Sequence, residues 1–131
     1  MEYLNLSKKE MMDLIRELMW EQRLDPQDFI EISLNYASDE KMMAYSKHES
    51  VSYMCDYVLE DDEINDVSKR KKCILKQVYE GGCDFDDLVS FPLMFEFWEK
   101  EKIIEFCEKE NISYIFTKEF LYDPDRVHSL F

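Results

Sequence analysis

Glycine and proline are nearly absent from this chain, which has two Gly and three Pro among its 131 residues. β-Sandwiches and barrels need many tight turns, and such turns draw heavily on glycine and proline. Apolar residues make up 46% of the sequence, and many recur at the three- and four-residue spacing of a helix. The sequence therefore predicts a mainly α-helical, single-domain bundle of five to seven helices that spans residues 1–131.

Capping signals place the first two helices. Ser7 and Glu10 have the spacing of a capping box, in which each side chain binds the other residue's backbone amide. The apolar residues that follow predict a helix over residues 8–23. Asp25 is the expected cap of a second helix, because Pro26 suits the first helical position.

The later helices are predicted from further start and stop signals. After a short third segment, Ser50 is the expected cap of a fourth helix. The acidic run at residues 60–63 is expected to lead into a fifth helix, with its acids at the helix start, and the glycine pair 81–82 is expected to end that helix. The spacing from Leu93 onward predicts one long helix, closed by Asn111.

The C-terminal part of the chain differs in composition. Residues 112–117 are rich in β-branched and aromatic residues, which are typical of strands. A lone strand needs a partner, and residues 2–6 are the other candidate. We therefore expect a small two-stranded antiparallel pairing of residues 2–6 and 112–117 beside the helices. Residues 123–125 predict a turn or a helix start.

Charge is the strongest indication of function. Thirty acidic residues against sixteen basic ones give a net charge of −14, which repels nucleic acids and anionic membranes and attracts basic protein surfaces. The acids cluster in three groups: one before the fifth helix, one after the glycine pair and one along the last long helix. The predicted partner-binding residues are Glu60, Asp61, Asp62, Glu63, Asp84, Asp86, Asp87, Glu101, Glu105 and Glu108.

Tyrosine adds to this prediction, because the chain has eight Tyr and some of them must reach the surface. Exposed Tyr supplies interface area at a low cost in side-chain entropy, so acids around it favour a specific protein contact. The candidates are Tyr3, Tyr36, Tyr45, Tyr53, Tyr57, Tyr114 and Tyr122.

No catalytic, metal-binding or cofactor-binding residues are predicted. The four cysteines have no short-spaced pair of the kind that binds structural zinc. Residues 61–66 lack the central glycine of a calcium loop. A Cys83 nucleophile with His48 or His128 as its base has no supporting sequence signature.

Direct nucleic-acid binding is not predicted either. The run at residues 69–72 has four consecutive basic residues, which are able to contact phosphates. Around a helix, however, four consecutive side chains point in all directions, and the acids that precede them lie within helical reach.

The N-terminus has no signal-peptide pattern, and no apolar run approaches the length of a membrane span. We therefore expect a cytoplasmic protein, in a bacterial or host cell cytosol, with reduced thiols and no membrane partner.

These features favour an acidic protein inhibitor that binds and blocks a basic nucleic-acid-binding protein or nuclease, with carboxylates in place of phosphates. The chain is similar in kind to phage inhibitors of the anti-CRISPR or anti-restriction type, which are small, acidic and poor in motifs. An immunity protein or antitoxin that neutralises a toxic nuclease fits the same properties. A small enzyme or adaptor whose acidity serves only solubility is the alternative of another class. The sequence leaves the partner and the oligomeric state open.

Overall fold

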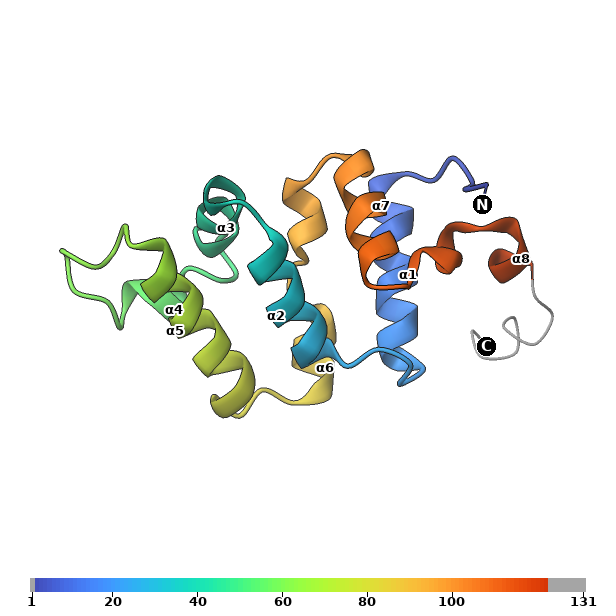
Figure 1. Cartoon of the computed structure of the whole chain (residues 1–131). Coiled ribbons are helices and arrows are strands. Elements are labelled where there is room, and N and C mark those ends of the chain that lie inside the picture. Colours follow the sequence, from blue (N-terminus) through green and yellow to red (C-terminus); the bar gives the residue numbers. More distant parts are fainter. Residues whose placement is uncertain (1, 123–131) are drawn as a thin grey trace. The chain divides into compact units, whose positions relative to one another are not determined.

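A computed structural model describes residues 2–122, and these residues are predominantly helical (Figure 1). They contain eight α-helices, two short 3₁₀ helices and no β-strand, which confirms the predicted mainly α-helical class. The predicted turn at residues 123–125 lies outside the described residues. The chain divides into two compact units, unit 1 (Met1–Leu24 with Trp98–Phe131) and unit 2 (Asp25–Phe97). Each unit is described by itself, and the single-domain organisation stays a prediction.

Unit 1 contains α1 (Lys8–Trp20), α7 (Lys100–Lys109), the 3₁₀ helix η2 (Ser113–Phe116) and α8 (Lys118–Leu121). The predicted capping box is confirmed, because Ser7 Oγ accepts from the Glu10 amide at 3.1 Å and the Glu10 carboxylate accepts from the Ser7 amide at 2.9 Å. α1 ends before residue 23, since Gln22 adopts a positive φ of 59°. The buried apolar residues of these helices include Met11, Leu14, Ile15, Leu18, Met19, Ile103, Phe106, Ile115 and Phe116.

The predicted strand at residues 112–117 is wrong. Ser113–Phe116 form η2, and the contact with the N-terminal segment is a single antiparallel bridge between Tyr3 and Thr117. Consecutive residues of a strand point to opposite faces, whereas Ile115 and Phe116 are both completely buried. A tight helical turn places two such neighbours in one core more readily than a strand does.

Unit 2 contains α2 (Pro26–Tyr36), α3 (Asp39–Ser46), α4 (Tyr53–Asp56), α5 (Val67–Glu80), α6 (Phe85–Ser90) and the 3₁₀ helix η1 (Met94–Phe97). α5 packs against α2, α3 and α4, and α2 also packs against α6 and η1. The predicted cap of α2 is confirmed, because Asp25 Oδ1 accepts from the Gln27 amide at 2.9 Å. The core includes Phe29, Ile30, Leu34, Met42, Tyr45, Met54, Ile74, Val78, Leu88 and Phe95.

Two predicted helix starts in unit 2 are wrong. Ser50 does not cap α4, because the N-cap position is Ser52, and the Ser50 amide donates to His48 Nδ1 at 3.1 Å in the turn before the helix. The acidic run does not begin α5 either. The cap of α5 is Asp66, whose Oδ1 accepts from the Lys69 amide at 3.2 Å. The predicted stop of α5 is confirmed at Gly82, which has a positive φ of 78°.

The long helix predicted from Leu93 onward is also wrong, because it is split into η1 and α7. The residue before α7, Glu99, has extended backbone dihedrals (φ −72°, ψ 157°) that interrupt the helical path. Beside it, Trp98 is buried against Phe106, with their ring centroids 5.3 Å apart. Asn111 ends α7 as predicted, with a positive φ of 61°. Within residues 2–122, no helix combines the length and apolarity that crossing a membrane requires.

Candidate partner-binding surface

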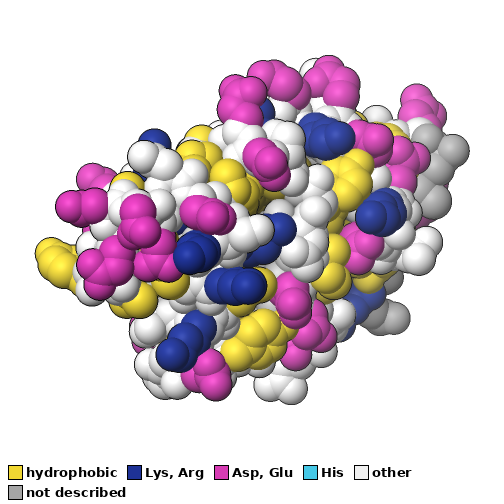
Figure 2. All heavy atoms as spheres, turned by 60° about the vertical axis from the view of Figure 1, so that its left-hand side comes forward, with side chains coloured by type: hydrophobic (Ala, Val, Ile, Leu, Met, Phe, Trp, Pro, Cys, Tyr) yellow, Lys and Arg dark blue, Asp and Glu magenta, His cyan; other side chains and the backbone are white. Residues whose placement is uncertain are grey.

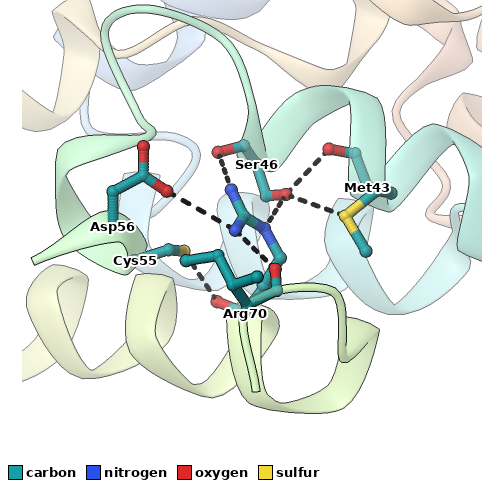
Figure 3. A network of polar contacts seen from close by, with 6 residues as sticks. Met43, Ser46, Cys55, Asp56 and Arg70 are labelled. Carbon is teal, nitrogen blue, oxygen red and sulfur yellow. Dashed lines mark hydrogen bonds and ion pairs between the residues drawn. The ribbon is translucent and has the colours of Figure 1, made fainter. Parts of the chain in front are cut away.

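The most deeply buried charge in unit 2 is Arg70 on α5, which is 2% exposed (Figure 3). Its guanidinium donates to Ser46 Oγ at 2.6 Å, to the Ser46 carbonyl at 3.0 Å and to the Ile64 carbonyl at 2.8 Å. It also lies 3.5 Å from the carboxylate of Asp56. A buried charge is tolerated when its donors are satisfied in this way. Arg70 therefore joins the ends of α3 and α4 to the segment that precedes α5.

That segment, which we call the 57–66 loop, extends away from the helices of unit 2 (Figure 1). Its fold depends on Glu63, whose Oε1 accepts from the Glu60 amide at 3.3 Å and whose Oε2 accepts from Lys69 Nζ at 2.6 Å. These hydrogen bonds lower the pKa of Glu63 below its ordinary 4.5. Glu63 and Arg70 thus support the loop from two sides.

Two large apolar side chains at the start of the loop are in contact with solvent. Tyr57 is 88% exposed and Val58 is 67% exposed. The next exposed residues are Glu60, Asp61 and Asp62. On the side that Figure 2 turns toward the viewer, acidic side chains gather around a protruding end where hydrophobic side chains also reach the surface. The loop therefore combines exposed apolar area with a rim of carboxylates.

The second predicted acidic group lies at α6. Asp84 is a cap, because its Oδ1 accepts from the Asp87 amide at 2.8 Å. Asp86 and Asp87 are exposed in the first turn of α6. The acids at residues 60–63 precede α5 and this group follows it, at the other end of a 14-residue helix, about 20 Å long. The start of the loop lies nearer to this group, because Val58 lines a hollow with Glu80 and Gly81 at the end of α5.

The third predicted group lies on α7 in unit 1. Glu101, Glu105 and Glu108 are exposed along this helix, as their spacing predicts. Glu105 forms an ion pair with Lys102 at 3.3 Å, and Glu108 accepts from the Tyr3 hydroxyl at 3.0 Å. Basic and hydroxyl groups of unit 1 therefore already neighbour these carboxylates.

The sequence predicts that the basic side chains at residues 69–72 point in different directions, and the structure agrees for the first three of them. Lys69 binds Glu63, Arg70 is buried, and Lys71 Nζ donates to Asn35 Oδ1 at 3.2 Å. Three consecutive cations thus have three separate structural partners, and they present no continuous row of charge to phosphates.

Within the described residues, Cys83 and His48 form no hydrogen bond with each other. Cys83 Sγ donates to the Gln77 carbonyl at 3.7 Å, whereas His48 Nε2 lies 3.7 Å from Glu96. His128 lies outside the described residues. In residues 2–122, no group of three or more His, Cys, Asp or Glu side chains is placed to hold a metal ion.

The chain matches no protein-family model, no curated protein and no solved structure. The function of the 57–66 loop is therefore inferred from its own geometry. Sequence reasoning identified its acids and included Tyr57 among many tyrosines, but it missed Val58 as a surface residue. The available signal was the Tyr57-Val58 pair directly before an acidic run.

Proposed function

We propose that this protein is an acidic inhibitor that binds a basic nucleic-acid-binding protein, with a nuclease as the expected class, through the 57–66 loop. The observation that supports the proposal is the exposure of Tyr57 and Val58 directly beside Glu60, Asp61 and Asp62. Interfaces take most of their binding energy from a few buried anchors, with Tyr among the commonest. Complementary charges around such anchors raise the association rate and exclude wrong partners.

The support beneath the loop also favours binding. Ordering a mobile segment at an interface costs about 0.5–1.5 kcal/mol for each immobilised side chain. Arg70 and Glu63 already hold the backbone of the loop through hydrogen bonds at 2.8 and 3.3 Å. Part of that ordering is therefore complete before a partner arrives.

In this mechanism the carboxylates of the loop occupy positions that backbone phosphates take in a basic groove. Tyr57 and Val58 bury their apolar area against the groove wall, which phosphates do not do. The inhibitor then competes with nucleic acid for the same cations and gains additional contact energy from its apolar residues.

The test uses a panel of purified nucleases with basic grooves: an RNA-guided effector, a restriction endonuclease and a toxic DNase. We expect cleavage by at least one of them to be blocked at a near-stoichiometric ratio, and the block to weaken as salt rises. Full activity of every nuclease in the presence of excess protein would contradict the proposal.

Two variants with equal loss of charge locate the contact. Neutralising the loop (Glu60→Gln, Asp61→Asn, Asp62→Asn) should slow association about tenfold at low salt. The matched control neutralises α7 (Glu101→Gln, Glu105→Gln, Glu108→Gln) and should leave association unchanged. If the α7 variant loses binding instead, the contact does not lie on the loop.

The apolar anchor is tested separately. Tyr57→Ser should speed dissociation by about 30-fold, because loss of a central Tyr anchor costs about 2 kcal/mol or more. Tyr79→Ser is the control: Tyr79 is also exposed, but its hydroxyl donates to Glu31 at 2.6 Å within unit 2. Equal dissociation rates for the two variants would argue against Tyr57 as an anchor.

A further inference from the structure

A hollow of about 340 Å³ lies beside α4 in unit 2. Tyr53 and Asp87 form part of its lining, Phe91 and Pro92 add apolar surface, and Ser50 and Ser90 supply hydroxyls. Its volume is at the lower end of the range for ligand pockets, about 300–1,000 Å³. The hollow therefore suits a single large side chain better than a bulky ligand.

The charge of this hollow has one sign. Asp87 is its acidic residue, and its lining contains no Lys or Arg. Burial raises the pKa of Tyr53, and the nearby Cys83 and Asp87 raise it further, so the ring and the carboxylate lie close enough to interact. An aromatic ring beside a carboxylate attracts a cation through both its quadrupole and the full charge.

Another hollow in unit 2 differs in this respect. It has a volume of about 280 Å³, and its lining includes Met54 and Val58 together with Lys76 and Glu80. The ammonium group of Lys76 belongs to the lining of this other hollow. The net charge of that lining therefore does not favour a further cation. The comparison favours the hollow at Tyr53 and Asp87 as the cation site.

The hollow and the proposed contact surface share the short helix α4. Tyr53 is the first residue of α4, and Tyr57 follows it by four residues at the C-terminal cap of that helix. Residues four apart on a helix lie on the same face, about 5–6 Å from one another. A partner that buries Tyr57 is therefore positioned to place a side chain in the hollow.

We infer that this hollow receives an arginine side chain of the basic partner, with the guanidinium between the Tyr53 ring and the Asp87 carboxylate. The aliphatic stem then packs against Phe91 and Pro92. Arginine suits this site better than lysine, because its planar group stacks on aromatic rings and offers five donors to the carboxylate and the serine hydroxyls. The inference rests on the proposed function, since it names the side chain that the partner contributes.

The experiment uses N-acetyl-arginine amide as the probe and needs no partner protein. In a titration followed by ¹H–¹⁵N NMR, we expect saturable shifts at Ser50, Tyr53 and Ser90, with a Kd on the order of 1–10 mM. The citrulline analogue has the same shape without the charge and should bind at least fivefold more weakly. The lysine analogue should also bind more weakly. Absence of saturation with the arginine probe, or equal affinity for citrulline, would overturn the inference.

Two substitutions on α6 make a matched pair. Asp87→Asn should weaken the arginine probe at least fivefold, whereas Asp86→Asn, a neighbouring carboxylate outside the lining, should leave its Kd unchanged. Equal effects would reduce the site to general electrostatic attraction and refute it. If the probe binds but no nuclease is inhibited, the proposed function fails and the site stands. If a nuclease is inhibited while the probe does not bind, the site fails alone.

Discussion

The 57–66 loop and α7 are both rich in acidic residues, yet they differ in net charge and in support. The ten residues of the loop include five acids and no basic residue, whereas the ten residues of α7 include three Glu and three Lys. The loop adds exposed Tyr57 and Val58 and is held by buried Arg70, while α7 pairs its Glu105 with Lys102. The density of acidic residues alone therefore does not distinguish a binding surface from a solvated helix face. Under the proposed function, local net charge beside exposed apolar area makes that distinction.

The largest expected effect concerns the support of the loop. Arg70→Ala leaves the carbonyls of Ser46 and Ile64 without their donor, and a buried acceptor that loses its partner costs about 1–3 kcal/mol of unfolding free energy. Denaturant unfolding, with hydrogen exchange of the α5 amides, measures this loss. Arg70→Met, which keeps much of the side-chain volume, separates lost packing from lost hydrogen bonds.

Arg23 in unit 1 provides the control for that measurement. Its guanidinium lies 5.8 Å from the Tyr114 ring centroid and 5.6 Å from that of Phe120, but 47% of its side chain is exposed. A cation–π contact at such an exposed site is worth about 0.5–1 kcal/mol. If Arg23→Ala cost as much as Arg70→Ala, burial of Arg70 would not be what makes the loop's support strong.

A smaller effect is expected at the helix caps. Asp66→Ala removes the side-chain cap of α5, where the loop ends, and should cost about 1 kcal/mol. Glu99 occupies the same position before α7 but makes no side-chain cap hydrogen bond, so Glu99→Ala should change stability by less than about 0.5 kcal/mol. Thermal unfolding of the two variants measures this difference. If both variants lose the same stability, the side-chain cap hydrogen bond of Asp66 does not distinguish the two helix starts.

The smallest effect is a shift in titration. The pKa of Glu63 is below 4.5, chiefly because its carboxylate accepts from Lys69. A carboxylate with a lowered pKa in the folded protein stabilises the fold above its ordinary pKa, and this contribution is lost as pH falls through the lowered value. Lys69→Met should therefore raise the pKa of Glu63 toward 4.5. Carboxyl ¹³C NMR measures the shift.

Glu10 provides an internal reference in the same titration. Its pKa is lowered by the hydrogen bonds of the Ser7 capping box in unit 1, of which Lys69 is not a member. The pKa of Glu10 should stay lowered in Lys69→Met. If both carboxylates moved together, a change in overall charge rather than a lost contact would explain the result.

Local capping rules predicted much of this fold, because each depends on a few neighbouring residues. Ser7 with Glu10, Asp25 with Pro26, and Asn111 have the predicted roles. The wrong predictions have separate causes: the long helix extended apolar spacing across a local break, the strand was predicted from composition, and the Ser50 cap was predicted from a signal that the turn before α4 overrides. Glu99 divides the expected long helix, and the buried pair at residues 115–116 replaces the expected strand.

The candidate site was predicted only as a set of acids, since spacing along the chain does not reveal which groups meet. Asp87 became a candidate for cation binding when the fold placed it near Tyr53. Arg70 belongs to a basic run in the sequence, and burial is what distinguishes it from Lys69 and Lys72. Asp87 and Arg70 thus differ from similar residues in the side chains that surround them, and the pattern of a single sequence does not contain that information.

The contact between Cys55 and Arg70 has a kinetic consequence. The Cys55 thiol is buried and donates to the Arg70 carbonyl at 3.6 Å, and burial raises its pKa to about 11. At neutral pH only about one such thiol in ten thousand is ionised. Because the thiol is also buried, alkylating reagents should react with it only after α4 separates from α5. The rate at which Cys55 is labelled therefore reports how often the contact between α4 and α5 opens, at the base of the 57–66 loop.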